Sequence, residues 1–210
     1  MIYSEKHNYI FVHIPKTGGT SIRKALAKTY HKSGLEQVPN QAIGVPSMRP
    51  VKHSPAVYIK RAVGLSSWNS FYRFAFVRNP WDWCVSTYHF IKKTRRDPRR
   101  SLVSKMSFDD FVVWLYNNLE SLKRMHQSFN GQNSYIINKK GKVLVDFVGR
   151  FENLQDDYAK ICNNIGIKPK ILGTHNGTKH KQYKEYYTDT TINMVSTIFK
   201  KDINIFNYSY

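Results

Sequence analysis

Residues 9–21 read YIFVHIPKTGGTS, an apolar run that breaks into proline, lysine and two glycines before hydroxyl side chains follow. Residues 9–14 are almost entirely apolar, which is typical of a parallel strand covered on both faces. The residues at positions i, i+3, i+4 and i+7 from Ile22 are Ile, Ala, Leu and Thr, which is the spacing of an amphipathic helix. Glycines permit close backbone approaches, and a helix N-terminus offers N–H groups and a positive dipole end. The stretch therefore predicts a strand, loop and helix unit whose loop binds an anion.

Residues 73–90, RFAFVRNPWDWCVSTYHF, predict a second unit of the same kind. An apolar strand comes first, Asn79 can cap the helix that follows, and Pro80 suits the first turn of that helix. The side chains expected to be buried at helical spacing are Trp81, Cys84, Val85 and Tyr88. Ser86 then lies on another face of the helix, from which its side chain can point toward Arg78 at the end of the strand. Open α/β sheets bind ligands at the carboxyl ends of their strands, so the two units predict two anion sites there.

Further elements are expected along the rest of the chain. A capping-box-like pair, Ser107 and Asp110, favours the start of a helix, and Gly141 lies near the turn of an expected hairpin. The elements are helices at 108–119, at 154–165 and from about Thr188, and a hairpin within 134–151. Their apolar and aromatic stripes are interpreted as core positions.

Composition limits the class of protein. The chain has 210 residues, of which 41% are hydrophobic, so we expect a single globular domain over residues 1–210. Its 33 Lys and Arg against 14 Asp and Glu give a net charge of +19, which favours an anionic partner such as nucleic acid, a phosphorylated cofactor or an acidic glycan. Charge alone does not choose among these partners.

The location of the protein is predicted from its cysteines and its N-terminal sequence. Cys84 and Cys162 lie in apolar stretches and are interpreted as packed thiols of a reducing compartment. We expect no membrane span, because no window is long and apolar enough. The first strand begins near Tyr9, which leaves no room for a signal sequence. These observations predict a cytoplasmic protein.

Both anion-site motifs resemble those of a known enzyme family. HIPKTGGTS (residues 13–21) resembles the 5′-phosphosulfate loop of sulfotransferases that use 3′-phosphoadenosine 5′-phosphosulfate (PAPS), and FVRNPWDWCVSTY (76–88) resembles their 3′-phosphate motif. KHSPA (52–56), GRFENLQDDY (149–158) and KHKQYKEYYTDTT (179–191) also resemble the carbohydrate sulfotransferases. That group includes the heparan and chondroitin enzymes and small bacterial or viral relatives. The resemblance covers most of the chain.

The resemblance implies a fold and a reaction. The fold is an α/β, P-loop-like sulfotransferase fold with a central, mostly parallel sheet flanked by helices. The reaction is in-line transfer of a sulfuryl group from PAPS to a hydroxyl acceptor, expected to be on a carbohydrate. Because a sulfuryl group carries less negative charge than a phosphoryl group, backbone N–H groups and a lysine can suffice, and we expect no metal.

The resemblance also implies roles for individual residues. Lys16 is expected to place its charge on the bridging oxygen of the leaving phosphate. Arg78, through its planar fork, and Ser86 are expected to hold the 3′-phosphate. A late basic loop closes over the nucleotide in the family, which assigns cofactor contacts to Lys179 and Lys181. The residues expected around the 5′-phosphate are Lys16, Thr17, Gly18, Gly19, Thr20 and Ser21.

His53 is expected to be the general base. Histidine is the side chain best matched to accept a proton near neutral pH, and the family places its base in a comparable segment between the two cofactor motifs. The alternative is a surface residue or backbone cap beside the turn at Ser54 and Pro55. His13, on an apolar strand, is interpreted as a core histidine. The family often carries Arg at the position of Trp83, and we expect this difference to change a surface or substrate contact.

Two other functions are compatible with parts of the sequence. A P-loop kinase is disfavoured because the lysine of the loop precedes the glycines instead of following them. A nucleic-acid-binding protein is compatible with the net charge, but no helix-turn-helix, zinc-finger or RNA-binding signature is present, so we expect no nucleic-acid partner. The basic run at 92–100 is interpreted as a solvated loop, with a grip on an anionic acceptor as the alternative.

Overall fold

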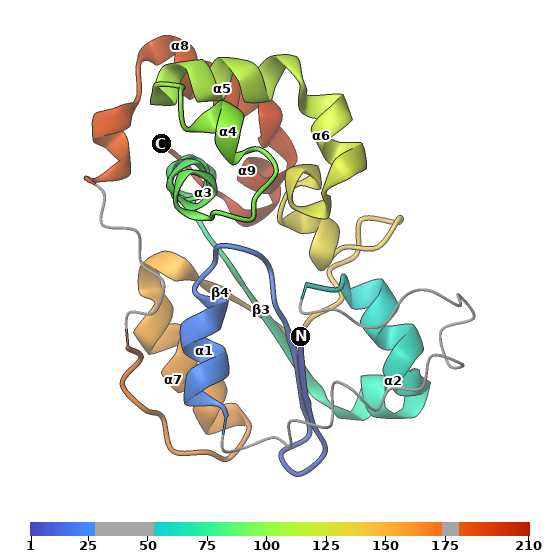
Figure 1. The fold of residues 1–210 in the computed structure, drawn as a ribbon. Coiled ribbons are helices and arrows are strands. Elements are labelled where there is room, and N and C mark those ends of the chain that lie inside the picture. Colours follow the sequence, from blue (N-terminus) through green and yellow to red (C-terminus); the bar gives the residue numbers. More distant parts are fainter. Residues whose placement is uncertain (28–52, 174–180) are drawn as a thin grey trace. The chain divides into compact units, whose positions relative to one another are not determined.

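The computed structural model describes residues 1–27, 53–173 and 181–210. The chain forms two compact units: Met1–Val77 with Ser134–His175, and Arg78–Asn133 with Asn176–Tyr210 (Figure 1). Of the residues expected from the sequence to bind the cofactor, Lys179 lies outside the described residues.

The first unit contains a four-stranded sheet in the order β1-β2-β3-β4. Its strands are β1 (Ile2–Ser4), β2 (Tyr9–Val12), β3 (Tyr72–Val77) and β4 (Phe147–Arg150). Strands β2, β3 and β4 are parallel, and β1 runs antiparallel to β2 at the edge. Every residue of β2 is buried, as the unbroken apolar run predicts for a strand covered on both faces.

Helices cover both faces of this sheet. They are α1 (Gly19–Ala25), α2 (Ala56–Ser70) and α7 (Leu154–Asn164). Figure 1 shows α1 and α7 on one side of the strands and α2 on the other. The core between the strands and helices α1 and α7 includes Phe11, Phe74, Ile22, Leu26, Tyr158 and Ile161. These observations confirm an α/β fold with a mostly parallel sheet flanked by helices.

The second unit is helical. Its helices are α3 (Pro80–Lys93), α4 (Arg100–Val103), α5 (Phe108–Asn117), α6 (Leu119–Met125), α8 (Asp189–Ile198) and α9 (Lys200–Phe206). Short 3₁₀ turns at Gln127–Asn130 and Tyr183–Tyr186 connect them. The predicted capping box is present, since Ser107 accepts from the Asp110 N–H and the Asp110 side chain accepts from the Ser107 N–H.

Helix α3 begins as the sequence predicts. The Asn79 side chain accepts a hydrogen bond from the Trp81 N–H at 3.0 Å, and Pro80 occupies the first helical turn. The predicted stripe of Trp81, Cys84, Val85 and Tyr88 is buried. Local capping and periodicity were therefore sufficient to predict this helix.

Trp83 corrects an expectation. It was expected to make a surface or substrate contact, but it is 2% exposed. Its ring packs edge to face on Phe199 and Phe129, with ring centroids 5.3 and 6.3 Å apart. Helix α3 is covered on more than one side by its own unit, so its buried surface is wider than a single stripe.

The hairpin expected within 134–151 forms only in its first part. Ile137 and Val143 form an antiparallel bridge, flanked by hydrogen bonds from the Asn138 N–H to the Lys142 carbonyl and from the Leu144 N–H to the Ile136 carbonyl, with Gly141 in the turn. The later residues instead form β4, which pairs in parallel with β3. A long-range partner therefore takes the strand that local sequence assigned to a hairpin.

Both cysteines of the chain lie in the interior. Cys84 and Cys162 are buried and form no disulfide. Within the described residues, none of the helices combines the length and the apolar character needed to cross a bilayer.

Candidate functional site

The turn after β2 has an unusual backbone. Lys16 has a φ of 68° and Gly18, the N-cap of α1, has a φ of 79°. Among the described residues, the other non-glycine residues with positive φ are Asn8 and Asn207. Asparagine tolerates this region, whereas a lysine there is strained by roughly 1–2 kcal/mol. Strain of this kind is concentrated at functional sites, so Lys16 is a candidate functional residue on structural grounds as well.

The two glycines of the turn are required by packing. A Cβ on Gly19 would overlap the ring of His13, and a Cβ on Gly18 would lie 2.8 Å from the side chain of Leu154. Side chains of the protein itself therefore fill the space beside these glycines. The turn can pack against β2 and α7 only because both residues lack a side chain.

Two hydroxyl groups of the turn donate hydrogen bonds to backbone carbonyls of the protein. Thr17 Oγ1 donates to the Ile14 carbonyl at 2.9 Å, and Ser21 Oγ donates to the Gly173 carbonyl at 2.8 Å. A phosphate oxygen needs a donor, so in this conformation the protons of these hydroxyls are directed elsewhere. Their contacts with the 5′-phosphate stay a prediction, as do those of Lys16, Gly18, Gly19 and Thr20.

His53 lies against His13 in the first unit. The two ring centroids are 4.4 Å apart, and His53 Nδ1 is 2.9 Å from the His13 carbonyl oxygen. A carbonyl only accepts hydrogen bonds, so Nδ1 carries the proton and the lone pair of the neutral imidazole is on Nε2. The His13 ring in turn stacks on Phe11, with centroids 5.4 Å apart, and is 2% exposed.

This arrangement links the loop to the predicted base. His13 contacts the ring of His53, and its own ring occupies the place that a Cβ on Gly19 would take. The burial of His13 agrees with its interpretation as a core histidine. Its position between the loop and His53 could not be predicted, because no local pattern indicates which residue packs on Gly19.

Arg78 and Ser86 lie in the second unit, and both are buried. The Arg78 guanidinium is paired with Asp82: Nε donates to Oδ2 at 2.7 Å and Nη2 donates to Oδ1 at 2.9 Å. This fork-to-fork geometry fixes the plane of the guanidinium. Asp82 is thus a partner of Arg78, which the sequence analysis did not identify, although the two residues are four positions apart.

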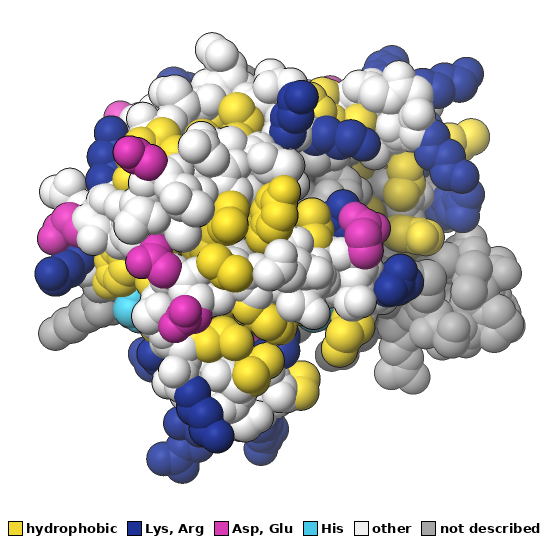
Figure 2. Space-filling view, turned by 90° about the horizontal axis from the view of Figure 1, so that it is seen from above, with side chains coloured by type: hydrophobic (Ala, Val, Ile, Leu, Met, Phe, Trp, Pro, Cys, Tyr) yellow, Lys and Arg dark blue, Asp and Glu magenta, His cyan; other side chains and the backbone are white. Residues whose placement is uncertain are grey.

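Lys181 and the basic run differ in how they contact the protein. Lys181 is 75% exposed, and its ammonium is 3.9 Å from Glu185. Within residues 92–100, Lys92 donates to the Tyr88 hydroxyl at 2.8 Å, and Arg99 pairs with Asp97 at 2.7 Å. Part of this run is therefore folded onto its own unit. In Figure 2 the Lys and Arg side chains lie in several separate groups on the face shown.

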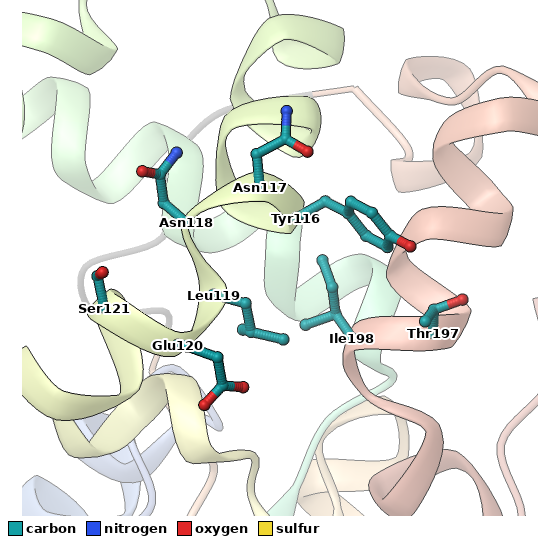
Figure 3. Close-up of a pocket in the computed structure, with 8 residues that line it drawn as sticks. All are labelled: Tyr116, Asn117, Asn118, Leu119, Glu120, Ser121, Thr197 and Ile198. Atoms are coloured by element: carbon teal, nitrogen blue, oxygen red, sulfur yellow. The ribbon is translucent and has the colours of Figure 1, made fainter.

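A pocket of about 360 Å³ lies in the second unit. Figure 3 shows its lining, which comes from the α5–α6 junction and the end of α8: Tyr116, Asn117, Asn118, Leu119, Glu120, Ser121, Thr197 and Ile198. None of the site residues predicted from the sequence lines it. Within the described residues, no group of three or more His, Cys, Asp or Glu side chains is arranged to hold a metal ion.

Comparisons with known proteins agree with the two motifs. Residues 1–209 match the model of a family described as the sulfotransferase family. An uncharacterized protein of Archaeoglobus fulgidus is 32% identical over 119 residues, which are 56% of this chain and 86% of that protein. Carbohydrate sulfotransferase 10 of Xenopus laevis is 22% identical over 98% of this chain and 66% of its own length.

The fold has a counterpart among solved structures. The crystal structure of mouse sulfotransferase SULT7A1 complexed with PAP matches with a TM-score of 0.52 and 15% identity, over 96% of this chain and 85% of that one. The sequence motifs, the fold and the match along nearly the whole chain point to one assignment. The chain belongs to the sulfotransferase family, the PAPS-dependent enzymes that its two motifs resemble.

Proposed function

We propose that this protein transfers a sulfuryl group from PAPS to a hydroxyl of a carbohydrate, with His53 as the general base. The likeness to a carbohydrate sulfotransferase supports the acceptor class, and the likeness to a sulfotransferase solved with PAP supports the donor. PAPS supplies the sulfuryl group and a bisphosphate leaving group.

One observation carries the proposal: the turn of Lys16 and the ring of His53 are joined through His13 within one unit. Lys16 follows β2 in a strained backbone conformation, and His13 contacts both Gly19 of the turn and His53. In this proposal Lys16 stabilises the charge that develops on the leaving oxygen, because a fixed ammonium costs no reorganisation during the reaction.

The hydrogen bond to His53 supports its role as base. The bond from Nδ1 to the His13 carbonyl leaves Nε2 as the basic atom and fixes the orientation of the ring. In this proposal Nε2 takes the proton of the acceptor hydroxyl as the oxygen attacks. A positioned base of this kind accelerates a reaction by roughly 10²–10⁴-fold.

Arg78 and Ser86 are proposed to hold the 3′-phosphate. The pairing of Arg78 with Asp82 orients the guanidinium, and the burial of Arg78 strengthens its interaction with an anion. Lys179 and Lys181 are proposed to contact the nucleotide. The exposure of Lys181 is compatible with that role.

The test replaces His53 and measures transfer and nucleotide binding separately. We expect His53→Ala to lower kcat by roughly 10²–10⁴-fold while the dissociation constant of PAP stays within about twofold. The parent's rate should rise with pH as the base loses its proton, and this limb should vanish in the variant. The matched control is His7→Ala, since His7 lies in the β1–β2 turn of the same unit.

The outcomes separate the parts of the proposal. An active His53→Ala protein with an unchanged pH profile would remove His53 as the base. A protein that binds ATP with Mg²⁺ but not PAP would contradict the donor. Transfer to lipids or small alcohols, with none to glycans, would contradict the acceptor class.

A further inference from the structure

Gln132 holds the backbone of Arg78 from both sides. The Arg78 N–H donates to Gln132 Oε1 at 2.8 Å, and Gln132 Nε2 donates to the Arg78 carbonyl at 2.7 Å. Gln132 is 3% exposed and Arg78 is 7% exposed, so these bonds are shielded from water. Arg78 lies between the last residue of β3 and the Asn79 cap of α3, outside both elements. The Gln132 side chain thus forms the hydrogen bonds with the Arg78 backbone that a neighbouring strand forms with residues inside a sheet.

Gln132 is itself anchored by a buried carboxylate. Asp202, on α9, accepts from the Gln132 N–H and from the Asn133 N–H, each at 2.7 Å. Asp202 is fully buried, and burial raises its pKa, although hydrogen bonds from Asn133 and Gln132 oppose the shift. Gly131 completes the turn with a φ of 86°, and a Cβ there would lie 3.1 Å from an Asp202 oxygen. The turn therefore has little room to move.

The two ends of Arg78 are thus fixed by different residues. Gln132 holds its backbone, and Asp82 holds its guanidinium. Preorganisation of this kind raises affinity because less freedom is lost when a ligand binds. A phosphate-binding arginine needs it especially, since a bidentate contact depends on the direction of the fork.

We infer that Gln132 is a positioning residue that sets the 3′-phosphate affinity of the enzyme through Arg78. The inference rests on the proposed role of Arg78. It assigns a function to residues 131–133, which lie outside both cofactor motifs. Asp202 acts one step further away, as the anchor of Gln132.

The experiment compares two nucleotides that differ by the 3′-phosphate. Dissociation constants of 3′-phosphoadenosine 5′-phosphate and adenosine 5′-phosphate are measured by calorimetry for the full chain and its variants. Their ratio isolates the affinity contributed by the 3′-phosphate. We expect Arg78→Ala to bring this ratio close to one and Gln132→Ala to reduce it on the order of tenfold, the effect of a lost or misdirected hydrogen bond.

The matched control is Gln155→Ala. Gln155 also holds backbone from both sides, through Lys170 O at 3.1 Å and the Leu172 N–H at 2.8 Å, but in the first unit. We expect this control to leave the ratio unchanged. If Gln132→Ala does not fold, Gln132→Glu keeps the shape while it removes the donor to the Arg78 carbonyl, and we expect it to reduce the ratio as well.

Each outcome decides a different claim. If Arg78→Ala keeps the parent ratio, the proposed role of Arg78 is wrong. If Arg78→Ala lowers the ratio and Gln132→Ala does not, the inference about Gln132 is wrong. It is also overturned if Gln132→Ala weakens both nucleotides equally together with a lower melting temperature, since that result indicates a structural role alone.

Discussion

The contact between Gly19 and His13 gives a prediction that depends on geometry and not on activity. A methyl group at Gly19 would overlap the His13 ring, whose Cδ2 and Nε2 atoms are the nearest. The ring cannot move away easily, because His13 is 2% exposed and its ring contacts the rings of both Phe11 and His53. Gly19→Ala should therefore destabilise the fold by overpacking.

The magnitude follows from the crowding. An added methyl in a well-packed site destabilises by about 1–3 kcal/mol. For a chain of this size, each kcal/mol lowers the melting temperature by about 2–4 °C, so we expect a fall of roughly 2–12 °C. Backbone strain does not contribute, since Gly19 has no positive φ. By contrast, a Cβ on Gly141 would meet no atom within 4 Å, but Gly141 has a φ of +79°. Gly141→Ala should therefore lower the free energy of unfolding by about 1 kcal/mol through backbone conformation alone.

The assay is urea unfolding followed by circular dichroism for Gly19→Ala, His13→Ala and the double variant. His13→Ala removes the ring that the methyl would hit, so the double variant should be more stable than the sum of the single effects predicts, by about 1 kcal/mol or more. Strictly additive effects would show that the two positions do not touch. That result would refute the packing explanation of Gly19.

Two further predictions concern titratable groups. Burial raises the pKa of Asp146, but the hydrogen bonds and the charge of Arg73 outweigh this effect and hold the pKa below the ordinary 3.8. The ionised Asp146 side chain therefore stabilises the fold fully above that pH, and this stabilisation is lost as the pH falls through the folded-state pKa. The Asp146→Asn variant should therefore be less stable than the parent at pH 7 and should lose less stability on acidification. Thermal unfolding at a series of pH values tests this, and the same pH dependence of the melting temperature in both proteins would contradict it. Burial raises the pKa of Cys84 to about 12, so a thiol reagent at about pH 8 should leave this cysteine unmodified in the native protein and modify it after unfolding, as mass spectrometry will show. Rapid modification of Cys84 in the folded protein would contradict its burial.

Two of the elements beside the candidate site could be predicted from local sequence. The apolar run before Lys16 indicated a strand buried on both faces, and β2 is buried at every position. The cap at Asn79 and the proline after it marked the start of α3. These signals are reliable because capping and periodicity act between residues within one or two turns of each other.

Other elements could not be predicted in this way. The edge strand β1 and the helices α2 and α9 were not predicted, and residues 147–150 pair with β3 instead of completing a hairpin. Pairing between distant strands depends on which hydrophobic faces the rest of the chain leaves to be covered. A local pattern does not contain that information.

The candidate site shows the same division. Sequence by itself determined that Lys16 and Arg78 each follow a buried strand, because apolar runs and turn residues are local. Tertiary structure alone decided that His13 fills the space beside Gly19 and that Gln132 holds Arg78 across a separation of 54 residues. Hydrogen bonds and packing between distant residues form only when the chain folds, since the loss of chain entropy is offset by many contacts at once. The sequence therefore locates the two turns that are predicted to bind anions, and the fold supplies the side chains that hold them in place.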